Sequence, residues 1–157
     1  AQADALQDVE GVLVLDDIAG FVSEKDYLAF AHPYLKEVFD AFPGALKLFH
    51  NDTNNPVSYR HIGALGAHIF NFTHEQPLAK VRALTGPTLC LMGNVPSSLL
   101  VAGSYTQVKE YCRHLIETCG RGGGYILAPG SAGIDRAKVE NLRAMVDAAR
   151  EYGFYRK

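Results

Sequence analysis

Five short runs of apolar residues recur along the chain, and each is followed by polar residues and then by a segment with helical spacing. The runs cover residues 12–15, 46–50, 67–72, 88–92 and 125–128. Continuous apolar runs of this length are typical of strands buried in a parallel sheet. Because the crossovers are long enough for parallel pairing, the order predicts an α/β domain with the βα unit repeated five times over residues 1–157.

Polar and glycine residues mark where the predicted elements begin and end. Ser23 is expected to cap the helix after the first strand, and Asp135 the last helix. A short helix is expected over residues 57–65, and Gly93 with Asn94 is expected to end the fourth strand. The predicted buried face of the last helix comprises Val139, Leu142, Met145, Val146 and Ala149.

Two architectures fit this order of elements. One is an open doubly wound sheet, and the other is part of a closed (βα)8 barrel, which usually needs about 250 residues. Five units would form an incomplete barrel with two unpaired strand edges and an uncovered inner face. Such edges are prone to pair with other chains in water.

Composition and charge exclude several classes of function. The chain has 157 residues, 48% of them hydrophobic, and a net charge of -2 with both signs interspersed. No basic stripe indicates nucleic acid, and no apolar run is long enough to span a membrane. Three cysteines without metal-type or framework spacing favour reduced thiols and a cytoplasmic location.

The candidate chemistry lies where the predicted strands end. Since the carboxyl ends of parallel strands meet at one rim, these side chains are expected to lie close together. They comprise Asp16, Asp17, His50, Asp52, Asn71, His74, Gly93, Asn94 and Ser131. Each also has a purely structural interpretation: Asp16 or Asp17 as turn caps, His50 bonded to a backbone carbonyl, Asp52 in an Asx-turn, His74 at a helix entry.

The cysteines and the glycine-rich segment are not expected to take part in catalysis or ligand binding. Cys90, Cys112 and Cys119 are expected to pack in the core. The glycines at residues 122–124 precede a strand, whereas a phosphate-binding glycine loop follows one. No nucleophile elbow is present.

Several segments resemble the uroporphyrinogen decarboxylase superfamily. Gly93-Asn94-Val95, followed by leucines and Gly103, is similar to the family's G-N-x-D-P…L…G signature. The segments at 123–130 and 140–146 and the helix around Pro33 are also similar, in the same order. The resemblance implies a (βα)8 barrel of TIM type, of which this chain supplies roughly the last five units.

The resemblance implies two activities. One branch of the superfamily decarboxylates uroporphyrinogen, a tetrapyrrole, without a metal. The other transfers methyl groups to or from a corrinoid protein, using zinc held by an H-x-C motif and a later cysteine. Here the H-x-C position is His50-Asn51-Asp52 and the later cysteine position is Ser131, and serine is a poor zinc ligand.

The chain also departs from the decarboxylase signature. Pro96 stands where that branch has an aspartate, and residues 132–133 stand where it has a late histidine. The H-x-D spacing favours metal-assisted methyl transfer, with His50 and Asp52 as metal ligands. In that interpretation Asp16, Asp17 and His50 act in catalysis, while Asn71, Gly93, Asn94 and Ser131 contact substrate.

Two alternatives stay open. Decarboxylation would use Asp16, Asp17 and His50 as acid and electrostatic groups. A third interpretation is a non-catalytic half-barrel that needs a partner chain, the missing barrel portion or a second copy, to cover its open edges. We expect the chain to be part of a longer polypeptide and to lack full activity alone.

Overall fold

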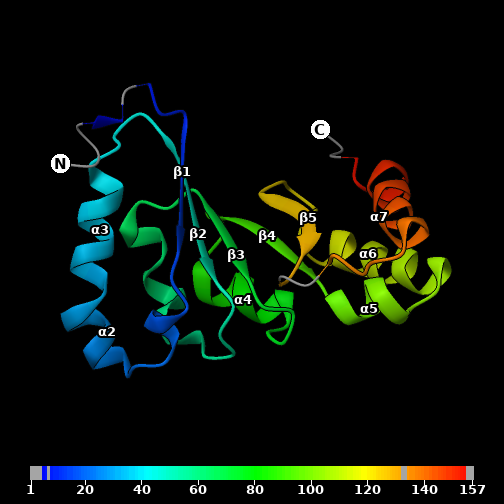
Figure 1. Ribbon diagram of the computed structural model, residues 1–157, viewed down its shortest axis with the longest axis horizontal. Helices are drawn as coiled ribbons and strands as arrows, with labels where there is room; N and C mark the ends of the chain where they lie inside the picture. The colour runs from blue at the N-terminus through cyan, green and yellow to red at the C-terminus, as the bar shows by residue number, and fades with distance from the viewer. Residues whose placement is uncertain (1–4, 7, 132–133, 155–157) are drawn as a thin grey trace.

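The computed structural model describes residues 5–6, 8–131 and 134–154, which form one parallel sheet with helices along it (Figure 1). The strands lie in the order β1-β2-β3-β4-β5, and each neighbouring pair is parallel. Their bounds are β1 Gly11–Leu15, β2 Leu46–Asn51, β3 Ile69–Phe72, β4 Cys90–Val95 and β5 Tyr125–Pro129. The predicted fivefold βα repeat is confirmed.

Six α-helices and three 3-10 turns accompany the strands in the described part of the chain, and the last helix follows the last strand. The helices are α2 Glu24–Phe30, α3 His32–Asp40, α4 Leu78–Thr85, α5 Ser97–Ala102, α6 Tyr105–Cys119 and α7 Val139–Tyr152. The 3-10 turns are η1 Ile18–Gly20, η2 Pro56–His61 and η3 Gly63–Leu65. The predicted helix over 57–65 is therefore two 3-10 turns, and α5 was not predicted.

Caps explain most of the helix boundaries. Ser23 Oγ accepts a hydrogen bond from the backbone N–H of Asp26 at 3.1 Å and begins α2 as predicted. Ser104 and Gln107 form a capping box at the start of α6. The prediction for α7 was wrong, because its N-cap is Lys138, whose backbone N–H donates to the Leu100 carbonyl. That bond fixes where α7 begins.

The main core lies between the sheet and its helices. Phe49, Phe70 and Phe72 point to the helical side of the sheet and are fully buried. Tyr59 from η2 meets Phe70 edge-on, with the ring centroids 4.9 Å apart. Such aromatic pairs add to the stabilisation that comes from buried area alone.

The opposite face of the sheet has no layer over it within the described residues. Leu13, Leu15 and Leu46 are 55%, 67% and 54% exposed, and Ile126 is 39% exposed. The expectation that residues 12–15 are buried on both faces was therefore wrong for this face. In a closed barrel, side chains at such positions fill the interior against the strands opposite.

The strand register arranges this inner face in rows. Leu15, His50, Asn71, Met92 and Ile126 are consecutive lateral partners across all five strands. The row beneath it is apolar: Leu13, Leu48, Ile69 and Cys90. Polar groups therefore enter the inner face only near the carboxyl ends of the strands.

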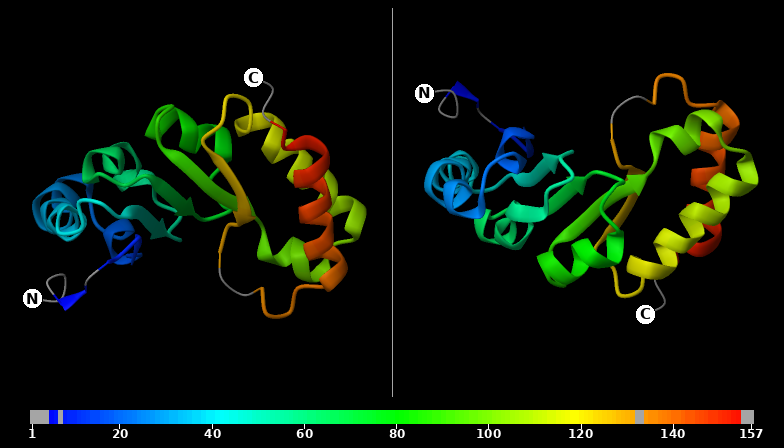
Figure 2. Two further views of the ribbon diagram at one scale, coloured as in Figure 1. Left: turned by 90° about the horizontal axis from the view of Figure 1, so that it is seen from above. Right: turned by 90° about the horizontal axis from the view of Figure 1, so that it is seen from below.

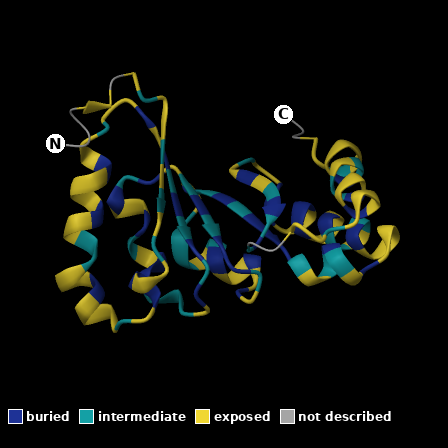
Figure 3. Ribbon diagram, viewed as in Figure 1, coloured by how far each residue is buried: buried dark blue, intermediate teal, exposed yellow. Residues whose placement is uncertain are grey.

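Both sheet edges are open, since β1 and β5 each pair on one side only. In Figure 2 the helices follow the curve of the sheet, and Figure 3 marks the exposed stretches of β1 and α7. Val139, Leu142 and Val146 of α7 are 64%, 37% and 48% exposed and Ala149 is also exposed, so the predicted buried face was wrong for these four residues. Met145 is partly buried and packs against the core, as predicted. Asn141, Ala144 and Ala148 face the protein instead.

Two further findings concern the predictions for the cysteines and for membrane-spanning segments. The described cysteines are all free, with Cys112 and Cys119 buried as expected and Cys90 half-buried on the inner face. Among the residues that the structure describes, no helix has the length and apolar character needed to cross a bilayer.

Candidate functional site

The carboxyl ends of the strands bring the predicted polar residues to one rim. His50 is the last residue but one of β2 and lies on the inner face, and its lateral partner in β3 is Asn71. The His50 Nδ1 atom lies 2.6 Å from Asn71 Oδ1, and Asn71 Nδ2 donates to the Met92 carbonyl at 2.7 Å. The imidazole is thus held between neighbouring strands. Its side chain is 18% exposed.

Asp52 follows His50 and turns back toward it. Its Oδ2 atom lies 3.6 Å from His50 Nε2, and the Asp52 side chain is 24% exposed. The Asp52 backbone N–H donates to Asp17 Oδ1 at 2.6 Å, so Asp17 ties the loop after β1 to the loop after β2. The structure therefore brings three of the predicted residues together: His50, Asp52 and Asp17.

Asp16 caps a turn, which was its structural interpretation from sequence. Its Oδ1 accepts the backbone N–H of Ala19 at 3.1 Å and so closes the turn at η1. Its carbonyl accepts the Asn51 side-chain amide at 2.7 Å. The Asx-type contact at this corner is made by Asn51, whose Oδ1 accepts the Thr53 N–H at 3.0 Å. Sequence reasoning assigned that role to Asp52 and missed Asn51.

Gly93 and Asn94 lie inside β4, which continues to Val95, so the expectation that they end the strand was wrong. The peptide bond between them is cis. Asn94 is 1% exposed, and its Nδ2 donates to the carbonyls of Thr73 at 3.2 Å and Gln76 at 2.8 Å. Asn94 therefore holds the loop after β3 against β4.

Ser131 lies on the loop after β5, and its hydrogen bonds join it to Ser97 and not to His50 or Asp52. Its Oγ is 3.2 Å from Ser97 Oγ, and its carbonyl accepts the Ser97 hydroxyl at 3.1 Å. The preceding Gly130 packs so closely that a Cβ there would lie 2.8 Å from the backbone nitrogen of His74. Residues 132–133, the predicted position of the missing late histidine, lie outside the described residues.

Sequence reasoning also missed residues in the loops. Gln76 is 5% exposed and donates to the Asn54 carbonyl and side chain, which links the loops after β3 and β2. A polar run that includes Thr73, His74 and Gln76 follows β3 directly. This pattern is the sequence signal that could have identified Gln76. His74 was among the strand-end candidates, with helix entry as its structural interpretation.

The charges at the rim affect a buried tyrosine on the helical side. Tyr59 is fully buried, and burial together with the negative charge of Asp52 raises the pKa of its hydroxyl above the ordinary value. Burial and the charge of Asp16 do the same for the pKa of Tyr27. Both phenols therefore stay protonated to a higher pH than an ordinary tyrosine.

The donor atoms of His50 and Asp52 suit a shared divalent ion. Two ligands at about 2.1 Å from a tetrahedral ion are about 3.4 Å apart, close to the 3.6 Å between His50 Nε2 and Asp52 Oδ2. No group of three or more His, Cys, Asp or Glu side chains in the described part of the chain could hold a metal. The pair fits as two ligands, and further positions would fall to water, substrate or other groups.

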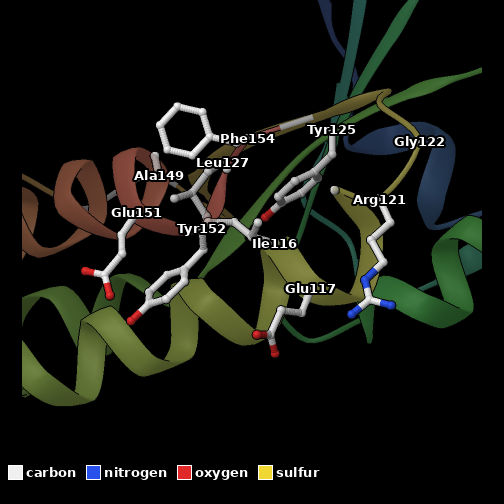
Figure 4. A pocket seen from close by; sticks show the side chains of 12 residues that line it. Ile116, Glu117, Arg121, Gly122, Tyr125, Leu127, Ala149, Glu151, Tyr152 and Phe154 are labelled. Atoms are coloured by element: carbon white, nitrogen blue, oxygen red, sulfur yellow. The ribbon is translucent and has the colours of Figure 1, made fainter. Parts of the chain in front are cut away.

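A sizeable cavity lies away from this rim. It has a volume of about 780 Å³ and opens beside the free edge of β5, between α6 and α7. Tyr125, Leu127 and Phe154 line it together with Arg121 (Figure 4). Because Tyr125 begins β5, the cavity lies toward the opposite end of the strand from the predicted site.

Comparison with known proteins gives consistent results along the whole chain. The family model described as uroporphyrinogen decarboxylase (URO-D) matches residues 1–152. The chain is 27% identical over 152 residues to the uroporphyrinogen decarboxylase of Thermus thermophilus, covering 96% of this chain and 43% of the relative. It is 23% identical over 148 residues to that of Gloeobacter violaceus, covering 90% and 41%.

A solved structure matches the fold. A methyltransferase from Methanosarcina mazei superposes with a TM-score of 0.80 at 20% sequence identity, covering 92% of this chain and 43% of that one. At this identity the likeness shows the fold alone. The chain thus spans about two fifths of the length of the proteins that it matches.

Proposed function

Because the chain belongs to the uroporphyrinogen decarboxylase family, we propose that it forms part of an enzyme barrel for metal-assisted methyl transfer involving a corrinoid protein. The observation that carries the proposal is the pair of donor atoms at the rim, His50 Nε2 and Asp52 Oδ2, 3.6 Å apart. They occupy the position where the methyltransferase branch is expected to have its H-x-C motif.

His50 and Asp52 would hold a divalent metal, with zinc as the first candidate. A metal bound there would lower the pKa of a thiol or water, or polarise the methyl donor. Asp17 supports this pair by accepting the backbone N–H of Asp52 at 2.6 Å, which fixes the loop that carries the carboxylate. Position 131 is serine, where the methyltransferase branch is expected to have a cysteine ligand. The available metal-ligand atoms are therefore nitrogen and oxygen, which zinc and other borderline divalent ions accept.

The remaining rim residues would surround the substrate. Asn71, Gly93 and Ser131 come from β3, from β4 and from the loop after β5, and Asp16 and Asp17 follow β1. Asn94, predicted from sequence to contact substrate, is 1% exposed and would act by holding the loop after β3 in place. Groups from several neighbouring strand ends are how parallel barrels assemble a small-molecule site. The methylated corrinoid would be presented by its own protein, and the reaction would take place in the cytoplasm.

Decarboxylation of uroporphyrinogen is the second candidate. It is favoured by the relatives named above, which are uroporphyrinogen decarboxylases matched over at least 90% of this chain. In that reaction Asp16, Asp17 and His50 would supply the acid and the fixed charges that stabilise a protonated pyrrole. No metal would be needed.

The exposed apolar surfaces favour a partner for the chain in either case. Leu13, Leu15 and Leu46 on the inner face are each more than half exposed, and within the described residues each edge strand is paired on one side only. Further βα units, or a second copy of the chain, would cover them. A half-barrel that only binds and does not catalyse is the third candidate.

The experiment that tests the proposal compares the two reactions on the longest natural polypeptide containing this sequence. Under anaerobic conditions it is mixed with methylcobalamin and a small thiol, and cob(I)alamin formation is followed by absorbance. In parallel, it is incubated with uroporphyrinogen and the products are counted by mass. We expect thiol-dependent demethylation that His50→Ala abolishes and that His114→Ala, an exposed histidine on α6, retains. Loss of carboxylates with methylcobalamin unchanged would favour the decarboxylase.

A further inference from the structure

A row of three lateral partners holds the His50 imidazole. His50 pairs with Asn71 and Asn71 pairs with Met92 in the strand register, so the three residues lie side by side on β2, β3 and β4. Asn71 bridges its neighbours: Oδ1 lies 2.6 Å from His50 Nδ1, and Nδ2 donates to the Met92 carbonyl at 2.7 Å.

The Met92 carbonyl decides the orientation of the Asn71 amide. A carbonyl oxygen only accepts hydrogen bonds, so the atom of Asn71 that faces it must be the NH2 group. The amide oxygen then faces His50. A flipped amide would place two acceptor oxygens about 2.7 Å apart at Met92, which the network excludes.

The orientation of the amide in turn decides which imidazole nitrogen carries the proton. Because Asn71 Oδ1 only accepts, His50 Nδ1 must donate to it. In the neutral ring the lone pair is then on Nε2, the atom 3.6 Å from Asp52 Oδ2. Metal-ligating histidines commonly bind through one nitrogen while the other donates to such an acceptor.

We infer that Asn71 is a positioning residue that fixes His50 in its Nδ1-protonated tautomer and directs the Nε2 lone pair to the rim beside Asp52. For the metal, this inference rests on the proposed function; for the tautomer, it rests on the hydrogen bonds alone. It gives Asn71 a role besides the substrate contact predicted from sequence, since both polar atoms of its amide are engaged within the sheet.

Imidazole nitrogen NMR tests the tautomer directly. The chain is labelled with 15N at histidine, stripped of metal with a chelator and measured at about pH 9, where histidines are neutral. We expect His50 to show a protonated Nδ1 and an unprotonated Nε2. Asn71→Ala should shift His50 toward the Nε2-protonated form. Asn71→Asp loses the bond to the Met92 carbonyl and must turn its second oxygen away from it, but it should keep the wild-type tautomer because its first carboxylate oxygen still accepts from Nδ1.

The variants also separate positioning from simple packing. If Asn71 only stabilises the sheet, Asn71→Ala and Asn71→Asp lower stability alike and leave the His50 tautomer unchanged. Circular dichroism and urea unfolding of both variants show that each is folded before the spectra are compared. An Nε2-protonated His50 in the wild type, or a tautomer insensitive to Asn71→Ala, would overturn the inference.

Zinc affinity, measured by competition with a chromophoric chelator, separates this inference from the proposed function. Loss of an outer partner of a ligating histidine weakens metal binding by roughly 10–100-fold, and we expect that loss in Asn71→Ala and near wild-type affinity in Asn71→Asp. A wild type with the expected tautomer but no zinc affinity would contradict the metal site and leave the tautomer assignment standing. Zinc binding equally tight in Asn71→Ala would contradict the positioning role and leave the metal site standing.

Discussion

Single asparagine side chains connect neighbouring βα units at several points. Asn51 links the loop after β2 to Asp16, Asn71 links β2 to β4, and Asn94 links β4 to the loop after β3. An amide suits this place because it donates and accepts at once without adding charge. These bonds hold the loops after β1, β2 and β3 to one another or to the neighbouring strands, so the positions of His50 and Asp52 depend on residues other than the two proposed ligands.

At the same scale, the buried thiol of Cys112 predicts a loss of stability at alkaline pH. Burial raises its pKa from 9.0 to about 12, so above pH 9 the thiol ionises in the unfolded chain while it stays protonated in the folded one. The contribution of this thiol to the free energy of unfolding is fully present below pH 9 and is lost as the pH rises toward about 12. Between about pH 8 and pH 10.5, we expect the free energy of unfolding to fall by about 1–2 kcal/mol less in Cys112→Ala than in wild type.

Urea unfolding at both pH values measures this difference. Tyr27 and Tyr59 also titrate in the alkaline range, but they are common to both proteins and cancel in the comparison. Equal pH dependence in the two proteins would show that Cys112 does not contribute.

At the scale of elements, a buried polar side chain joins α7 to the end of α5. Asn141 is fully buried, and its Nδ2 donates to the carbonyls of Leu100 at 2.8 Å and Gly103 at 3.0 Å at the end of α5. Asn141→Ala leaves both buried carbonyls without this donor, and we expect a loss of about 1–3 kcal/mol. Thermal and urea unfolding should show it, while Glu140→Ala, exposed on the same helix, should change stability by less than about 0.5 kcal/mol.

The strands were predictable from sequence because apolar runs reflect burial on the helical side, which the described chain itself provides. The exposed stripe of α7 and the exposed leucines of β1 were not, because no described element covers these apolar side chains. For the site, strand-end spacing identified His50, Asp52 and Asp17. It could not identify Asn51, Gln76 or the roles of Asn71 and Asn94, because those depend on hydrogen bonds between residues about 20 or more positions apart.

At the scale of the whole molecule, the sheet is a sector of a barrel whose inner face and both edges are uncovered in the described chain. Exposed leucine and isoleucine side chains over several adjacent strands form an apolar surface of the kind that drives association. The isolated 157-residue chain should therefore self-associate with increasing concentration and bind a hydrophobic dye.

Charged substitutions on the inner face test this prediction. Leu15→Lys and Ile126→Lys place charges among the exposed apolar residues and should reduce both dye binding and the mass measured by light scattering. Ala79→Lys, at an exposed position of α4, adds the same charge elsewhere and should leave both unchanged. A monomeric wild type that binds no dye would contradict the prediction.

The central claim is that His50 and Asp52 hold a divalent metal at the rim, and metal content tests it most directly. The longest natural polypeptide containing this sequence is purified without chelators or a histidine tag and analysed by plasma mass spectrometry, beside His50→Ala and His114→Ala. The account predicts about one zinc or similar ion per chain in wild type and in His114→Ala, and loss of the ion in His50→Ala. A wild type without metal, or a His50→Ala variant with the same content, would contradict it.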